Sequence, residues 1–184
     1  MGIKQTLDVL NAMQRDGVFD RFAIAGAVAA YNYIEPAVTE DLDIFVSFKG
    51  TSGSGLISLA PILDDLKKRG FTEFKKEGVL IAGWPVQFLP VADDLDAEAL
   101  DKAETVDVKA NGGSARVRVL RPEHLVAIAV RVGRAKDRVR ILQFLQEKAV
   151  SLKPLKSVLA RHKLMTAWRG FCQKAGTRDP FEAK

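Results

Sequence analysis

Two aspartates, Asp41 and Asp43, are the residues of this sequence best suited to chemistry, and they precede the apolar run Ile44-Phe45-Val46. That run predicts a strand, and residues two apart on a strand point to the same side. Two carboxylates held side by side repel each other unless a proton or a cation intervenes. Mg²⁺ or Mn²⁺ relieves this repulsion and can also bridge carboxylates to nucleotide phosphates. We therefore expect a metal site at Asp41 and Asp43, although an Asp-x-Asp pair alone is more often a solvated strand edge.

A second feature, Gly26, lies fifteen residues before Asp41. Residues 21–25 predict a short strand and residues 27–33 a helix, so Gly26 stands at a strand-to-helix turn. Backbone N–H groups at a helix start can bind phosphate oxygens, and a glycine lets a phosphate approach closely. Such a turn alone is ordinary packing. Its combination with the two aspartates predicts a phosphate cradle beside a metal pair.

The predicted elements alternate in the first part of the chain and are helical in the last part. Apolar periodicity and Gly or Pro breaks predict helices over residues 6–15, 27–33, 56–69, 95–103, 122–132, 134–149, 154–162 and 164–175. Strands are expected over residues 21–25, 42–48, 71–76, 79–82, 85–91, 105–109 and 115–119. Between them we expect a polar loop over residues 49–55 and turns at Glu77-Gly78, Gly83-Trp84 and Asn111-Gly112-Gly113. The fold class is α/β or α+β, with a core over residues 1–120 and a helical region over residues 121–184.

The composition suits a folded domain. Of the 184 residues, 47% are hydrophobic and 28% are charged, so a packed core with a solvated surface is feasible. The apolar runs are too short to span a bilayer, so no membrane partner is expected. The single cysteine, Cys172, excludes an internal disulfide, and with no apolar signal region the cytoplasm is the default location.

The net charge of +5 is unevenly distributed along the chain. Residues 1–115 carry 11 Lys or Arg and 18 Asp or Glu, whereas residues 116–184 carry 17 and 5. The basic half suggests a polyanionic partner such as RNA. It is equally consistent with a solvated basic helical surface that is attracted to the acidic half. The sequence leaves these two interpretations open.

The residues around the aspartate pair resemble the DNA polymerase beta-type nucleotidyltransferase superfamily, close to small stand-alone bacterial members such as the abortive-infection type E toxins. Members carry a Gly-Gly or Gly-Ser helix start and a Thr/Ser-x-Asp-x-Asp strand, matched here by Gly26-Ala27 and Thr39-Glu-Asp41-Leu-Asp43. The resemblance implies a mixed sheet backed by helices, a divalent metal at the aspartates and a nucleoside triphosphate held beside Gly26, Ala27 and Thr39. By analogy it also suggests an antitoxin-like protein partner.

A second pattern extends the resemblance over most of the chain. Relatives often carry a helix followed by Gly-Arg-x-Lys-Asp at the start of another helix, and this chain has Gly133-Arg134-Ala-Lys136-Asp137. The resemblance implies that Arg134 and Lys136 lie near the phosphates or the substrate, and that Asp137 helps to hold the turn.

Several positions depart from the family pattern. The most important is Gln87, in Pro85-Val86-Gln87-Phe88-Leu89-Pro90, because relatives often have a third carboxylate there. A glutamine is neutral, so it is a poor magnesium ligand and a poor proton acceptor. The other departures replace a small or hydroxyl residue, an arginine, a lysine and an aspartate, at Ala27, Ala37, Ala129 and Arg140.

Two functions are compatible with these residues. One is a magnesium- or manganese-dependent transferase that moves a nucleotidyl group from a nucleoside triphosphate to a hydroxyl of RNA, protein or a small molecule. In that enzyme Asp41 and Asp43 bind the metal, and Arg134 and Lys136 stabilise charge on the phosphorus centre. The other is a degenerate, non-catalytic module that keeps nucleotide or nucleic-acid binding. The aspartate pair favours the enzyme, and Gln87 favours the module.

Overall fold

A computed structural model describes residues 2–36, 38–49, 58–110 and 113–182. The chain forms two compact units: Met1–Ala29 with Ala37–Leu120, and Ala30–Pro36 with Arg121–Lys184. Each unit is described by itself below. Ala37, most of the expected loop at residues 49–55 and the first two residues of the Asn111-Gly112-Gly113 turn lie outside the described residues.

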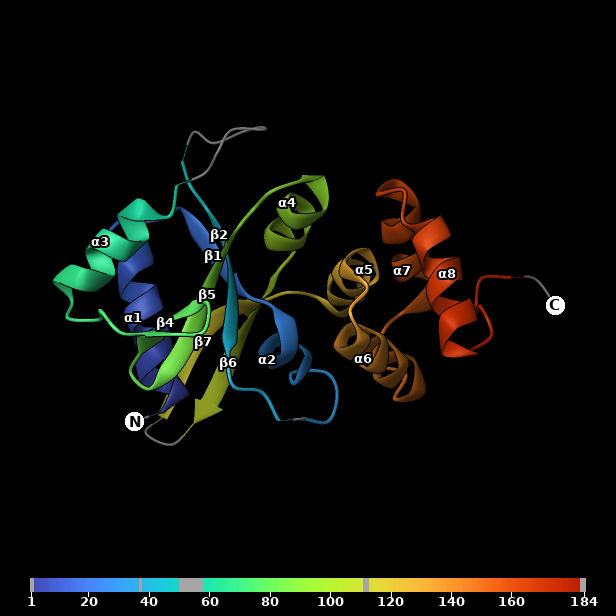
Figure 1. Cartoon of the computed structure of the whole chain (residues 1–184), viewed down its shortest axis with the longest axis horizontal. Coiled ribbons are helices and arrows are strands. Elements are labelled where there is room, and N and C mark those ends of the chain that lie inside the picture. Colours follow the sequence, from blue (N-terminus) through green and yellow to red (C-terminus); the bar gives the residue numbers. More distant parts are fainter. Residues whose placement is uncertain (1, 37, 50–57, 111–112, 183–184) are drawn as a thin grey trace. The chain divides into compact units, whose positions relative to one another are not determined.

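The first unit contains a seven-stranded sheet with the order β3-β4-β5-β2-β1-β7-β6 (Figure 1). β2 pairs antiparallel with β1 and parallel with β5, and β1 pairs parallel with β7, so the sheet is mixed. This arrangement confirms the expected α/β class. The strands are β1 (Arg21–Ile24), β2 (Leu42–Ser47), β3 (Phe74–Lys75), β4 (Gly78–Ile81), β5 (Trp84–Pro90), β6 (Glu104–Ala110) and β7 (Gly113–Val119).

Helices cover this sheet, with α1 and α3 on one side of it and α2 and α4 on the other in Figure 1. They are α1 (Ile3–Arg15), α2 (Gly26–Ala30), α3 (Ala60–Lys68) and α4 (Asp94–Asp101). The apolar side chains of α1 recur at helical spacing, and Leu7, Leu10 and Met13 are fully buried. Each buried side chain of this size contributes about 1.5–3 kcal/mol.

The side chains of β2 alternate between the two faces of the sheet, which separates its buried aliphatic residues from Asp43. Leu42, Ile44 and Val46 are fully buried, whereas Asp43 and Ser47 are half-buried. Because neighbouring strand residues point to opposite faces, burying the aliphatic set directs Asp43 to the other face of the sheet.

The described residues of the second unit form the helices α5 (Pro122–Val132), α6 (Ala135–Gln146), α7 (Leu152–Arg161) and α8 (Met165–Ala175). Trp168 of α8 is fully buried, and its Nε1 donates a 2.9 Å hydrogen bond to Asp179. Cys172 lies in the same packed face and is also buried, as the helical pattern predicts. Within the described residues, no helix is long and apolar enough to cross a membrane.

Several expected boundaries differ from the structure; for example, the turn expected at Gly83-Trp84 lies at Ala82 and Gly83, because Trp84 is the first residue of β5. The strand expected over residues 71–76 is only Phe74–Lys75, and the helix expected over residues 27–33 ends at Ala30. The turn expected at Glu77-Gly78 lies one residue earlier, at Lys76 and Glu77, because Gly78 is the first residue of β4. A Cβ on Gly78 would lie 2.9 Å from the Val86 nitrogen, so this glycine serves close strand packing rather than the turn.

Candidate active site

Gly26 and Asp43 are close neighbours at the centre of the candidate site. Gly26 has φ +58°, a left-handed conformation that favours glycine, and follows directly on β1 and Ala25. A Cβ built on Gly26 would lie 1.9 Å from Oδ2 of Asp43, and the backbone N–H of Ala25 donates to the Asp43 carbonyl at 2.8 Å. The Asp43 carboxylate therefore occupies the space that a side chain at residue 26 would need.

Asp41 immediately precedes β2 and is oriented by Thr39. The Thr39 hydroxyl donates a 3.0 Å hydrogen bond to Oδ1 of Asp41, and both residues are half-buried. A carboxylate that accepts such a bond keeps lone pairs for a cation. Thr39 therefore has a local role, which is to orient a predicted metal ligand.

Gln87 of β5 is the direct strand neighbour of Asp43. The parallel register pairs Asp43 with Gln87, while Val86 and Phe88 on either side are buried. The Gln87 side-chain amide donates a 2.9 Å hydrogen bond to Oε2 of Glu77, in the turn between β3 and β4. The neutral residue beside the aspartates is thus hydrogen-bonded to a carboxylate from another element.

A cavity of about 320 Å³ contains several of these groups. Asp41, Gln87 and Glu77 line it together with Lys75, Lys76, Gly78 and Pro85. Lys76 is also tied to the segment before β2, because its Nζ lies 2.6 Å from Oε2 of Glu40. This hydrogen-bonded ion pair lowers the pKa of Glu40 and raises that of Lys76. Charged side chains of both signs therefore line the cavity.

The donor groups suit a hard divalent cation with an incomplete protein shell. Asp41 and Asp43 provide carboxylate oxygens, which Mg²⁺ and Mn²⁺ prefer. Within the part of the chain that the structure describes, no group of three or more His, Cys, Asp or Glu side chains could hold a metal ion. A cation held by the two aspartates would take its other ligands from water and phosphate oxygens, as Mg²⁺ commonly does.

Arg134 and Lys136 belong to the second unit, at the turn between α5 and α6. Gly133, with φ +71°, ends α5, and Arg134 precedes α6. The Arg134 Nε donates to Oδ2 of Asp137 at 2.8 Å, and the Arg134 backbone N–H donates to the same oxygen at 3.2 Å. Asp137 is 2% exposed, so it anchors this turn, while Lys136 is exposed.

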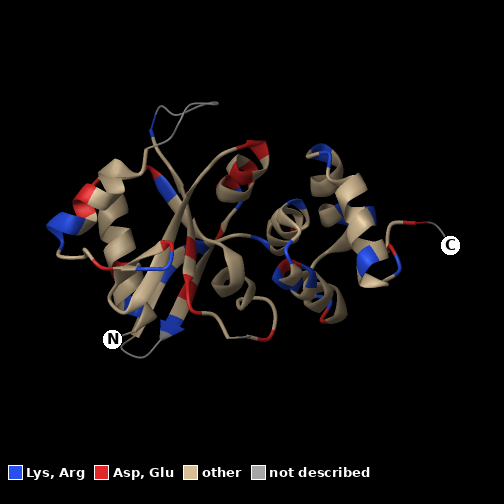
Figure 2. Cartoon of the chain, in the orientation of Figure 1, with Lys and Arg blue, Asp and Glu red and all other residues tan. Residues whose placement is uncertain are grey.

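Basic side chains are spread along the helices of the second unit. Figure 2 shows Lys and Arg on α5 to α8, with few Asp or Glu among them, whereas α4 of the first unit is acidic. Arg138 donates to the Gly133 carbonyl at 3.2 Å and Arg161 to the Ser157 hydroxyl at 3.3 Å. Some of these cations therefore contact their own helix ends or neighbours.

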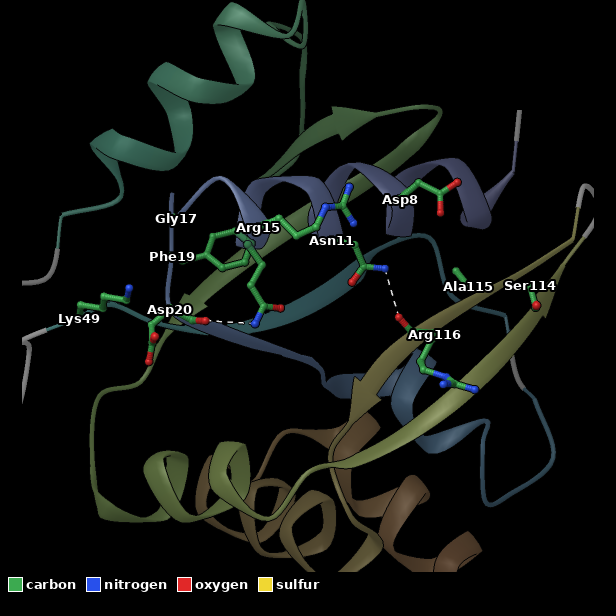
Figure 3. Close-up of a pocket in the computed structure, with 11 residues that line it drawn as sticks. Asp8, Asn11, Arg15, Gly17, Phe19, Asp20, Lys49, Ser114, Ala115 and Arg116 are labelled. Atoms are coloured by element: carbon green, nitrogen blue, oxygen red, sulfur yellow. Dashed lines mark hydrogen bonds between the residues drawn. The ribbon is translucent and has the colours of Figure 1, made fainter.

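A larger hollow of about 640 Å³ lies along α1 and β7 (Figure 3). Two of its side-chain amides are used in hydrogen bonds across it: Asn11 donates to the Arg116 carbonyl and Gln14 to the Asp20 carbonyl, both at 3.1 Å. The hollow includes none of the site residues expected from the sequence. The predicted chemistry and this hollow are therefore in different places.

Glu77, Lys75 and Lys76 are cavity residues that the sequence pattern does not single out. They lie in a short strand and a turn, where charged residues are usually solvated. One signal does point to Glu77: the β4–β5 hairpin pairs Val79 with Val86. Continuing that antiparallel register toward the β3–β4 turn brings residues 77 and 78 beside Gln87.

The mixed sheet flanked by helices has a counterpart among solved structures, and the fold is nucleotidyltransferase-like. The chain is similar to an antigenic nucleotidyltransferase-like protein from Paracoccidioides brasiliensis, with a TM-score of 0.58 and 19% identity over 93% of this chain and 87% of that one.

A solution structure of the antibiotic-resistance factor ANT(2'')-Ia gives a TM-score of 0.49 with 15% identity, over 94% of this chain and 97% of that one. A crystal structure of ANT(2'')-Ia in complex with adenylyl-2''-tobramycin gives 0.41 with 14% identity, over 92% and 98%. No protein-family model and no curated protein sequence matches the chain.

Proposed function

We propose that this chain is a divalent-metal-dependent nucleotidyltransferase that moves a nucleotidyl group from a nucleoside triphosphate to a hydroxyl. One observation carries the proposal: the Asp43 carboxylate is seated where only a glycine at position 26 leaves room for it. A purely solvated carboxylate would not need this close approach. The nucleotidyltransferase-like fold supports the same activity.

The chemistry assigns separate roles to the residues of the first unit. The acceptor oxygen forms a bond to the α-phosphorus, the bond from that phosphorus to the β-bridging oxygen breaks, and pyrophosphate leaves. A bound Mg²⁺ or Mn²⁺ would supply charge neutralisation for the phosphate oxygens. Asp41 and Asp43 would hold it, with Thr39 orienting Asp41.

Gly26 and Ala27 are proposed to contact the phosphates through backbone N–H groups. α2 has only five residues, so direct hydrogen bonds rather than a long helix dipole would make this contact. Arg134 and Lys136 are proposed as phosphate- or substrate-binding residues on the strength of the sequence resemblance. Lys136 is the better suited of the two, because Arg134 is engaged by Asp137.

A label-transfer screen tests the proposal directly. Each of the four triphosphates, labelled at the α-phosphate, would be incubated with the protein, Mg²⁺ or Mn²⁺, and total cellular RNA or protein. We expect label to appear on one class of acceptor with wild type and to be lost with Asp43→Asn. Label incorporation that persists in Asp43→Asn would contradict the assigned site.

A second function, a non-catalytic nucleotide-binding module, is favoured by one specific observation. Gln87 replaces a carboxylate beside Asp43, and the described residues contain no three-carboxylate group. Such a module would bind a metal–triphosphate complex and transfer no label. Calorimetric binding in the absence of incorporation would identify it.

The narrower resemblance to abortive-infection type E proteins adds a protein partner of the antitoxin type to the proposal. Such a partner would be co-expressed from a neighbouring reading frame and would relieve growth arrest caused by this chain. Growth that is unaffected by expression of the wild-type chain would remove the toxin interpretation while leaving the transferase activity to be measured separately.

A further inference from the structure

We propose that Glu77 is the base that takes the proton from the acceptor hydroxyl, and that Gln87 positions it. The inference rests on the nucleotidyltransferase function proposed above. In the reaction the acceptor O–H proton passes to the Glu77 carboxylate as the new O–P bond forms. The β-bridging oxygen keeps the electron pair of the broken bond and leaves with pyrophosphate.

The first support is the placement of Glu77 in the cavity. Glu77 lines the same 320 Å³ cavity as Asp41, and its Oε2 accepts a hydrogen bond from Gln87, the strand neighbour of Asp43. A proton acceptor must reach the hydroxyl beside the metal pair. Asp41 and Asp43 are assigned to the cation, so Glu77 is the carboxylate lining this cavity that remains for proton transfer.

The second support is that the turn carrying Glu77 is fixed at several points. A Cβ on Gly78 would lie 2.9–3.0 Å from backbone atoms of Val86, so Gly78 allows the start of β4 to pack closely on β5. On the other side of Glu77, Lys76 forms the ion pair with Glu40. Lys76 has φ +56°, which costs a non-glycine residue about 1–2 kcal/mol, and such a conformation persists only where its surroundings hold it.

The third support concerns Gln87 itself. A glutamine cannot act as the base, but its amide donates a 2.9 Å hydrogen bond to Oε2 of Glu77 and so holds that carboxylate in position. The described residues form no three-carboxylate metal group. A role for Glu77 in proton transfer, without metal ligation, agrees with both facts. Gln87 is then a positioning residue.

The test compares Glu77→Gln with Glu73→Gln, a control just before β3 whose side chain is exposed, like that of Glu77, but does not line the cavity. Transfer of α-labelled triphosphate should fall about 10²–10⁴-fold in Glu77→Gln, mainly in kcat, and remain unchanged in the control. The isosteric amide can still accept the hydrogen bond from Gln87, so the melting temperature should be unchanged. Transfer by Glu77→Gln at the wild-type rate overturns the inference.

Two further measurements separate proton transfer from a structural role. Formate, added as an exogenous carboxylate, should restore part of the activity of Glu77→Ala, which a structural defect would not allow. The double variant Glu77→Gln/Gln87→Glu returns a carboxylate to the cavity on the neighbouring strand and should recover transfer relative to Glu77→Gln. Failure of both rescues overturns the inference.

Metal binding distinguishes a base from a ligand, and it does not depend on turnover. Titration with Mn²⁺ followed by electron paramagnetic resonance should give equal affinities for wild type and Glu77→Gln, and a much weaker one for Asp43→Asn. A tenfold loss of Mn²⁺ affinity in Glu77→Gln would make Glu77 a ligand and overturn its role as base.

Absence of transfer by wild type with every triphosphate would overturn the proposed function, and this inference with it. Full transfer by Glu77→Gln beside an inactive Asp43→Asn would overturn this inference alone.

Discussion

At the scale of single residues, the site depends on the absence of a side chain at Gly26, because the Asp43 carboxylate fills the position that a Cβ would occupy. The left-handed φ of Gly26 and the 1.9 Å approach of Oδ2 to the position of its missing Cβ are two separate demands on the same residue. The first is a conformational preference and the second is steric exclusion. The two effects can be separated by mutation, because other glycines of the chain carry only the first.

Gly26→Ala is expected to lower the free energy of unfolding by about 1–3 kcal/mol more than Gly17→Ala does. Gly17 has φ +77° with nothing within 4 Å of its Cβ position, so its substitution reports conformational strain alone. The difference measures displacement of the Asp43 carboxylate. Urea unfolding followed by circular dichroism gives both values. Equal destabilisation of the two variants would show that the close contact is not maintained in solution.

Asp43→Asn tests the metal site. Magnesium or manganese together with a triphosphate should raise the melting temperature of wild type, because a ligand that binds only the folded state stabilises it. Removing one of two carboxylate ligands should abolish that rise. Differential scanning fluorimetry measures it, with the exposed Asp64→Asn as the control for loss of a charge. A rise that survives in Asp43→Asn would remove this residue from the metal site.

At the scale of elements, the boundaries expected from the sequence match the structure best where residues close in sequence determine them. α5 was predictable to the residue, over 122–132, because Pro122 starts it and Gly133, with φ +71°, ends it. The aliphatic alternation of β2 likewise placed Asp43 opposite the core. The β3–β4 turn was misplaced by one residue, because the requirement for Gly78 comes from Val86 on another strand.

The candidate site shows the same limit. Asp41, Asp43 and Gly26 were found from a pattern within one short segment of the chain. Glu77 does not stand out in the sequence, because its contact with Gln87 joins two elements and follows only once the β4–β5 register is known. Gln87 was noticed only as a departure, and its hydrogen-bond partner explains how a neutral side chain can serve the site.

The packing of α8 gives a prediction about Cys172. Burial, with smaller effects from the charges of Asp179 and Glu182, raises the pKa of this thiol to about 11. The folded state therefore keeps the proton between the ordinary value of 9.0 and about 11, and the thiol's contribution to stability is lost as the pH rises through that window. In native protein at pH 8, iodoacetamide should modify Cys172 far more slowly than in protein unfolded by urea.

Mass spectrometry of timed samples measures that difference. The pH dependence of unfolding between pH 9 and about 11 should be shallower for Cys172→Ala than for wild type, because only wild type carries the shifted thiol. Rapid alkylation of the native protein at pH 8 would contradict the buried position of the thiol.

At the scale of the whole molecule, the distribution of charge is the feature that bears on partners. Residues 116–184 carry 17 basic and 5 acidic side chains, while residues 1–115 carry 11 and 18. Much of the basic set is exposed on the helices of the second unit (Figure 2). An excess of basic side chains can attract a polyanion over long range. The alternative is that these side chains only keep the helical surface solvated.

We expect RNA to bind through this basic half with an affinity that falls steeply as salt increases. Reversing exposed cations, as in Lys136→Glu/Arg169→Glu/Lys174→Glu, should weaken binding and reduce the salt dependence. Arg134 is left intact, because it holds the buried Asp137. A matched reversal of Lys67, Lys68 and Lys102, which are exposed in the first unit, should have a smaller effect. Fluorescence anisotropy with labelled RNA measures both, and no binding at low salt would favour the solvated surface.

The two-residue Ala82-Gly83 connection between β4 and β5 fixes the register of the two strands, and so fixes which residues lie beside Gln87. One inserted residue would shift one strand by about 3.3 Å relative to the other and turn its side chains to the opposite face of the sheet. If Glu77 is the base, a neutral residue at position 87 adds a catalytic constraint to the packing constraint on the length of this connection. Among homologues, we expect insertions here to occur together with an acidic residue at the position of Gln87. The length of the connection and the identity of residue 87 should therefore covary.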